Sequence, residues 1–62
     1  MDPDANWIEQ ESGRADHDRM FDLIEALHLW IERGGFKPNA WQNDPTAEAR
    51  FDQRVHNFLG WT

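Results

Sequence analysis

The sequence predicts an all-α protein, a small helical hairpin with helices over about residues 16–33 and 45–59 and a long aromatic connector between them. Apolar residues recur at helical spacing in both segments. Each segment also begins at an acidic cap and ends at a glycine. Because a chain of 62 residues without cysteine has room for one small core, we expect residues 1–62 to form a single helical domain.

Residues 1–15 carry a weaker helical signal. Asp2 and Pro3 have the form of an N-cap and a first helical residue, so a short helix over about residues 3–11 is predicted. Such a helix has few large apolar side chains, with Trp7 the largest, and must dock on another surface to be stable. Two interpretations follow: Trp7 covers an edge of the core, or a flexible N-terminal segment orders only on binding a partner.

The central segment, residues 16–33, has the strongest periodicity, and we expect the other residues to be organised around it. Asp16 or Asp18 can cap its start, and Gly34 can adopt the left-handed conformation that ends a helix. At 100° per residue the large apolar side chains fall on one broad arc. This arc includes Met20, Phe21, Leu23, Ile24, Leu27, Trp30 and Ile31.

The connector, residues 34–45, is long for a helical hairpin. It contains Phe36 and Trp41, and Pro38 restricts the preceding residue to an extended conformation. We expect the two aromatic side chains to plug the open end of a two-helix core. The alternative is that they form part of an exposed docking patch.

The second helix is predicted to start at Asp44 and Pro45, as cap and first helical residue, and to stop before Gly60. Its apolar residues share one face. They are Ala47, Phe51, Val55, Phe58 and Leu59. We expect this face to pack against the apolar face of the central helix as an antiparallel hairpin, to which the N-terminal turn can add a third side.

The net charge of −6 is unevenly distributed. Residues 1–32 hold nine acids against two arginines, a net of −7, whereas residues 33–62 hold four basic residues against three acids, a net of +1. The chain lacks the basic surface that a nucleic-acid backbone requires, so no direct nucleic-acid binding is expected. A partner protein with a basic surface would be steered toward the first half.

Targeting signals and membrane segments are also missing from the sequence. No apolar run reaches the length of a membrane span, and the N-terminus has acids where a secretory signal needs a basic region. We therefore expect no membrane association and a cytoplasmic location.

No pattern of catalytic or metal-binding residues rises above chance. His17 and His28 would lie roughly 16 Å apart along one helix and cannot share an ion. Ser12, Thr46 and Thr62 are the only hydroxyl nucleophiles, and none is near a histidine in the sequence. We expect no enzymatic activity, no metal site and no cofactor.

The outer face of the central helix is the most informative surface. Five residues on it are candidates for partner binding and are called the acidic face below: Asp18, Asp22, Glu25, Leu29 and Glu32. Carboxylates three or four positions apart repel one another, at a cost of about 0.2 to 0.5 kcal/mol per pair in an isolated helix. Rows of charge usually do no more than solvate a helix, but acids around one exposed leucine also suit docking to a basic groove.

Two functions follow as hypotheses. The first is a non-catalytic interaction module that binds and modulates, for example inhibits, a basic partner protein through the acidic face, including by occupying a nucleic-acid-binding surface. The second is a structural homo-oligomer held by aromatic packing, because a core this small has little apolar area. Candidate docking or oligomer contacts are Trp7, Phe36, Trp41 and Trp61. Short acidic proteins of viruses and mobile elements have this general appearance, but no motif identifies a family.

Overall fold

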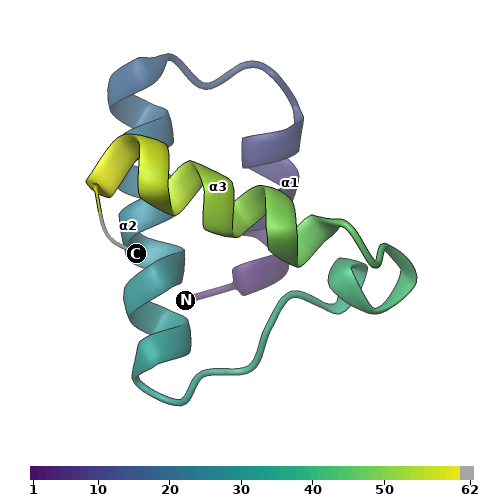
Figure 1. Cartoon of the computed structure of the whole chain (residues 1–62). Helices are drawn as coiled ribbons and strands as arrows, with labels where there is room; N and C mark the ends of the chain where they lie inside the picture. Colours follow the sequence, from purple (N-terminus) through teal and green to yellow (C-terminus); the bar gives the residue numbers. More distant parts are fainter. Residues whose placement is uncertain (61–62) are drawn as a thin grey trace.

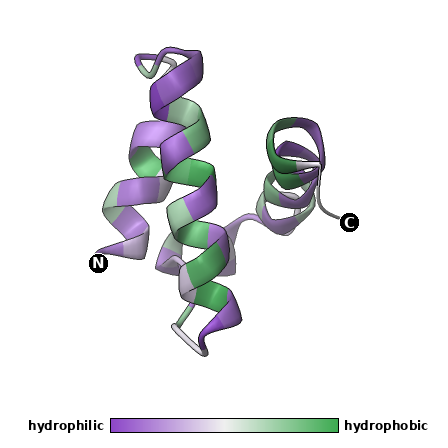
Figure 2. Cartoon of the chain, turned by 90° about the vertical axis from the view of Figure 1, so that its left-hand side faces the viewer, coloured by the Kyte–Doolittle hydropathy of each residue, from purple (hydrophilic) through white to green (hydrophobic). Residues whose placement is uncertain are grey.

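The computed structural model describes residues 1–60, and within this range every regular element is helical. The elements are α1 (Pro3–Glu11), α2 (His17–Glu32), the 3₁₀ helix η1 (Asn39–Asn43) and α3 (Ala47–Leu59). Figure 1 shows α1 and α2 running in opposite directions, with α3 crossing in front of them. In Figure 2, α1 and α2 stand side by side and α3 is seen nearly end-on. The predicted all-α class is confirmed.

The arrangement of the helices differs from the predicted hairpin of the second and third helices. The antiparallel pair is α1 with α2, and α3 lies across it, so the fold is a three-helix arrangement (Figure 1). The reason is that α1 carries the large, buried Trp7 and occupies one flank of α2. The connector between α2 and α3 is long enough to carry α3 across the remaining apolar surface.

Local sequence explains where α1 and α2 begin. The carboxylate of Asp2 accepts hydrogen bonds from the backbone N–H groups of Asp4 and Ala5, at 3.0 and 3.1 Å. The carboxylate of Asp16 accepts one from the N–H of Arg19, at 2.8 Å. Free N–H groups at a helix start need such acceptors, and acidic side chains there also interact favourably with the helix dipole. The predicted caps at both helices are confirmed.

The start of α3 lies two residues later than predicted, at Ala47 instead of Pro45. The Asp44 carboxylate accepts hydrogen bonds from the backbone N–H of Thr46, at 3.0 Å, and from its hydroxyl, at 2.7 Å. These bonds close a turn that precedes the helix, because the side chain of Asp44 satisfies groups of the turn and not of the first helical residues. At the other end, Gly60 ends α3 with a φ of 70°, as its position predicted.

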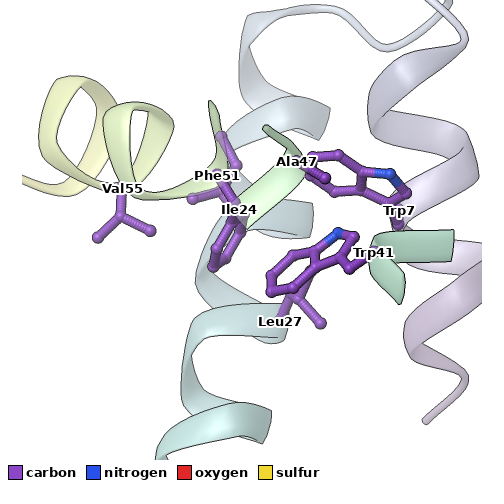
Figure 3. Packing of buried hydrophobic residues seen from close by; sticks show 7 residues of the cluster. All are labelled: Trp7, Ile24, Leu27, Trp41, Ala47, Phe51 and Val55. Carbon is purple, nitrogen blue, oxygen red and sulfur yellow. The ribbon is translucent and has the colours of Figure 1, made fainter. Parts of the chain in front are cut away.

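The core combines residues from all three α-helices and from η1 (Figure 3). Its buried members are Trp7, Ile24, Leu27, Trp41, Ala47, Phe51 and Val55. Trp7 and Trp41 meet edge to face with ring centroids 5.3 Å apart, and both rings contact Phe51. Aromatic rings bury a large area with few rotatable bonds, so these three supply much of the packing in a small core.

Buried polar contacts set the register between α1 and α2. The side-chain amide of Asn6 donates to the carbonyl of Leu23 at 2.9 Å, and the amide of Gln10 donates to Asn6 at 2.7 Å. Both amides are buried. Because a buried amide without a partner is unfavourable, sliding α1 along α2 would break this chain of hydrogen bonds and destabilise the fold.

Two arginines attach α3 to the end of α1. The carboxylate of Glu11 accepts hydrogen bonds from Arg50 and Arg54, and both guanidinium groups lie over the ring of Trp7, at 5.8 and 5.0 Å from its centroid. Partial burial by itself would raise the pKa of Glu11, but the hydrogen bonds from Arg54 and Arg50 outweigh it and lower that pKa. The three side chains, called the arginine clamp below, cover the outer side of Trp7.

Candidate functional site

The acidic face lies on the side of α2 that faces away from the core. The buried residues of α2 are Leu23, Ile24 and Leu27, roughly half a turn from the carboxylates. Leu29 stands among the carboxylates with 43 % of its surface exposed. The helix that supplies much of the core therefore also presents an apolar side chain surrounded by negative charge.

Most acids elsewhere in residues 1–60 have a partner within the chain. Ion pairs with arginine or lysine are formed by Glu9, Glu11, Asp44 and Glu48. Helix caps or backbone hydrogen bonds occupy Asp2, Asp4 and Asp16. Four of the six lysine and arginine side chains thus form ion pairs with acids outside the acidic face.

The carboxylates of the acidic face lack such partners. Within residues 1–60, no lysine or arginine nitrogen lies within 4.0 Å of Asp22 or Glu25. Asp18 is 4.0 Å from the ring of His17, and Glu32 is 3.7 Å from the ring of His28. These contacts are ionic only when the histidines are protonated. Direct ion pairs with arginine or lysine therefore do not neutralise the face, although Arg19, whose pKa is raised mainly by Glu9, also feels the charge of Asp22.

A groove of about 360 Å³, called the α1–α2 groove below, borders the acidic face. It is lined by Met1, Asp2, Ala5, Asn6, Glu9, Arg19, Asp22, Leu23 and Ala26. Leu23 and Asn6 are buried at its base, whereas Ala5 and Ala26 are exposed and leave space between the helices because they are small. Asp22 belongs to both the groove and the acidic face, so the two surfaces are continuous.

The connector forms a second groove, of about 460 Å³. Phe36 and Trp41 line it, and an ion pair between Lys37 and Glu48 lies beside them. Phe36 is 65 % exposed, while its backbone carbonyl accepts a hydrogen bond from the indole N–H of Trp30 at 3.0 Å. This groove has one carboxylate and one ammonium, which neutralise each other, so its charge favours no class of partner.

The aromatic residues suggested as docking or oligomer contacts differ in their exposure. Trp7 and Trp41 are only 4 % and 8 % exposed, so in this structure neither ring is presented to a partner or to a second copy. Their burial agrees with the interpretation that they complete the core. The expectation that Phe36 also plugs the core is wrong, because this residue is largely exposed, and it remains available as a contact. Trp61 lies outside the described residues.

No three of the histidine, aspartate and glutamate side chains in residues 1–60 are grouped so that they could hold a metal ion. No helix in this range is both long enough and apolar enough to cross a membrane.

Sequence reasoning did not identify Glu9 and Arg19 as neighbours of the acidic face. The Glu9 carboxylate accepts two hydrogen bonds from the Arg19 guanidinium, at 2.6 and 2.8 Å. The hydrogen bond from Arg19 lowers the pKa of Glu9. No local sequence pattern predicts this ion pair, because Glu9 lies on α1 and Arg19 lies on α2, and the contact between these helices depends on packing.

Comparison with known proteins identifies no relative. No protein-family model, no curated protein and no solved structure matches this chain. The candidate site therefore rests on the geometry described above.

Proposed function

We propose that this chain is a non-catalytic interaction module that binds a basic surface of a partner protein through the acidic face and thereby modulates that partner, in the simplest case by inhibiting it. One observation carries the proposal. Within residues 1–60, neither Asp22 nor Glu25 has an arginine or lysine nitrogen within 4.0 Å, although four other acids form such ion pairs.

Electrostatics explain why a basic partner would be favoured. Like charges three and four positions apart on α2 repel each other, and lysine or arginine side chains of a partner would relieve that repulsion. A single exposed ion pair contributes about 0 to 1 kcal/mol, so several pairs must form together. Leu29 adds an apolar contact at the centre of the face, where surrounding ion pairs exclude water.

A surface that binds nucleic acid is one basic surface of this kind. Such surfaces carry clustered arginine and lysine side chains that pair with phosphates. Carboxylates of the acidic face would occupy the same side chains and so exclude the nucleic acid. The expected consequence is inhibition that is competitive with nucleic acid and weakened by salt.

The test begins with retention of proteins from a native lysate on the immobilised chain. We expect a basic protein that is retained by the wild type, lost with the double variant Asp22→Lys and Glu25→Lys, and kept by Asp52→Lys. Asp52 is an exposed acid on α3 without an arginine or lysine within 4.0 Å in residues 1–60, so Asp52→Lys is the charge-matched control for each single variant, Asp22→Lys and Glu25→Lys.

Titration of the purified partner then decides the mode of binding. We expect affinity to fall steeply between low and high salt and to fall at least about tenfold in the double variant, corresponding to about 1.4 kcal/mol. A partner whose affinity ignores both salt and the double variant would contradict the proposed face.

The structural homo-oligomer remains a second proposal with less support. Two of its four suggested contacts, Trp7 and Trp41, are already buried within one chain. Phe36 is the exposed aromatic residue that could still meet a copy. Sedimentation at micromolar concentration tests it: a helical monomer of 7.4 kDa would exclude this function.

A further inference from the structure

The α1–α2 groove assigns a more specific chemistry to the partner. We propose that this groove receives the apolar side of a basic amphipathic helix, whose lysine or arginine side chains pair with the neighbouring carboxylates. The inference rests on the proposed function, since it names the kind of segment that the acidic face would recognise.

The base of the groove is suited to aliphatic side chains. Leu23 is buried there, and Ala5 and Ala26 form opposite walls with only a methyl group each. The volume of about 360 Å³ is enough to bury one or two aliphatic side chains of a partner. Asn6 is also at the base, but its amide is already bonded to Leu23 and Gln10, so it does not require a polar ligand.

The rim of the groove selects positive charge. Three acids line it, Asp2, Glu9 and Asp22, together with two positive groups, the Arg19 guanidinium and the N-terminal ammonium of Met1. Arg19 and Glu9 neutralise each other through two hydrogen bonds, and the Asp2 carboxylate caps α1, so Asp22 is the acid of the rim that remains for a cationic ligand. Asp22 continues the negative rim into the acidic face. A segment that fills the groove must therefore carry cations beside its apolar side chains.

The shape of the groove favours a helix as the bound segment. The groove lies between two antiparallel helices, where a third helix can pack its side chains. With nine residues, α1 offers a wall about 13 Å long, which matches roughly two turns of a partner helix. Aliphatic residues at positions i and i+4 of that helix would enter the groove, and flanking lysines would reach Asp22 and Glu25.

A second copy of this chain is the wrong occupant. The exposed apolar residue of α1, Ile8, could enter a groove, but Glu9 and Glu11 flank it. Docking that surface on the acidic rim would bring like charges together in a chain of net charge −6. Charge complementarity therefore selects a basic partner and not the chain itself.

The experiment uses two synthetic peptides of about 15 residues, long enough for some helix, made only of leucine and lysine in the same proportions. In one the leucines form a single helical face, and in the other they are distributed around the helix. Calorimetry measures the affinity of each peptide, and amide chemical shifts locate it. We expect the amphipathic peptide to bind at least about tenfold more tightly, as expected when one leucine side chain is buried, and to shift Ala5, Leu23 and Ala26.

Matched variants separate the groove from the charges. Ala26→Phe and Ala5→Phe fill the groove from opposite walls, and we expect each to abolish the preference for the amphipathic peptide. Ala49→Phe adds the same bulk at an exposed position of α3 and should leave the preference unchanged. Circular dichroism verifies that all three variants keep the helical content of the wild type.

The outcomes distinguish this inference from the proposed function. If both groove variants retain the preference while Asp22→Lys weakens both peptides, the groove is not the site, and the acidic face stands without it. If neither the groove variants nor the double variant Asp22→Lys and Glu25→Lys changes either affinity, both proposals fail. If only the groove variants matter, the groove does not select cations, and the inference is overturned.

Discussion

At the scale of single residues, Trp7 shows how a small core is closed from outside. Its ring packs on Trp41 and Phe51 on the inner side, and the arginine clamp covers its outer side. The guanidinium groups shield the indole while their charges remain paired with Glu11. Arginine suits this role because its guanidinium can lie over an aromatic ring and still donate to two acceptors. Arg50 donates to Glu11 and Asp44, and Arg54 donates to Glu11 and Gln10.

Removing one half of the clamp should weaken the fold. We expect Arg54→Ala to lower the free energy of unfolding by about 1 to 2 kcal/mol, since it loses the contact with Trp7 and the hydrogen bonds to Glu11 and Gln10. Urea unfolding measures the difference. Arg14→Ala is the control, because Arg14 is exposed and forms no ion pair in residues 1–60, and a change within about 0.5 kcal/mol is expected. Equal effects of the two substitutions would contradict the role of the clamp.

Gly35 is a residue whose lack of a side chain is required by a neighbour. A Cβ atom at this position would overlap the indole of Trp30, whose N–H donates to the carbonyl of Phe36. We expect Gly35→Ala to displace the indole and to cost about 1 to 3 kcal/mol. The indole N–H resonance of Trp30 should shift on loss of its hydrogen bond. An unchanged resonance would contradict the predicted displacement of the indole.

At the scale of elements, α2 has two opposite faces of different character. Its inner face supplies Leu23, Ile24 and Leu27 to the interior, and its outer face concentrates carboxylates around Leu29. Folding alone would favour mixed charges on the outer face, because pairs of opposite charge stabilise a helix and like pairs destabilise it. An acidic face that is locally unfavourable is consistent with selection for binding.

This reasoning predicts opposite effects of one substitution on stability and on binding. We expect Glu25→Lys to raise the free energy of unfolding by a few tenths of a kcal/mol, because the new ammonium lies three positions from Asp22. The same substitution should weaken binding of the basic partner. Urea unfolding and titration of the partner measure the two effects, and a variant that loses both stability and binding would indicate a structural role for Glu25.

At the scale of the whole molecule, ion pairs join different helices, and local sequence patterns do not predict them. Glu9 pairs with Arg19 between α1 and α2, and Glu11 pairs with Arg50 and Arg54 between α1 and α3. Each carboxylate is held in its charged form by a hydrogen bond from an arginine, and the pKa of each is lowered. The attachment of α1 to the other helices is thus sensitive to protonation.

The predicted pH dependence follows from these lowered pKa values. A carboxyl group with a lower pKa in the folded state binds fewer protons there than in the unfolded state, so it stabilises the fold above its ordinary pKa. We expect this contribution to be complete above the ordinary pKa of 4.5 for Glu9 and Glu11, and to disappear as pH falls through their lower folded values. Urea unfolding across this range measures it.

A variant locates the source of the acid sensitivity. Glu11→Gln removes the titrating group of the arginine clamp, so its stability should be lower than that of the wild type above pH 4.5 and should depend less on pH below it. If the wild type and the variant lose stability in parallel on acidification, the clamp is not a source of the pH dependence.

The candidate site was predictable in part. The acidic face follows from residues three and four apart on one helix, and α2 has the periodicity that makes such spacing reliable. The α1–α2 groove could not be predicted, because it needs Ala5 and Ala26 to face each other across two helices. Their approach depends on the hydrogen bonds of Asn6 and on the burial of Trp7, neither of which has a local signature.

The sequence by itself determined where the helices form. Caps at Asp2 and Asp16, and the glycine after α3, act on backbone groups within a few residues, so they can be recognised without knowledge of the fold. The exception is the start of α3, where the side chain of Asp44 closes a turn before the helix. The acidic face on α2 is equally local, because one helix carries all of it.

Only the tertiary structure decided how the helices pack. The apolar arc of α2 is wide enough for two neighbours, and periodicity alone does not say which helix takes which side. Trp7, Trp41 and Phe51 settle the choice, because their rings fill one space only when α1 lies along α2 and α3 crosses it. Packing of large side chains from distant segments depends on their joint shape, and that shape exists only in the folded chain.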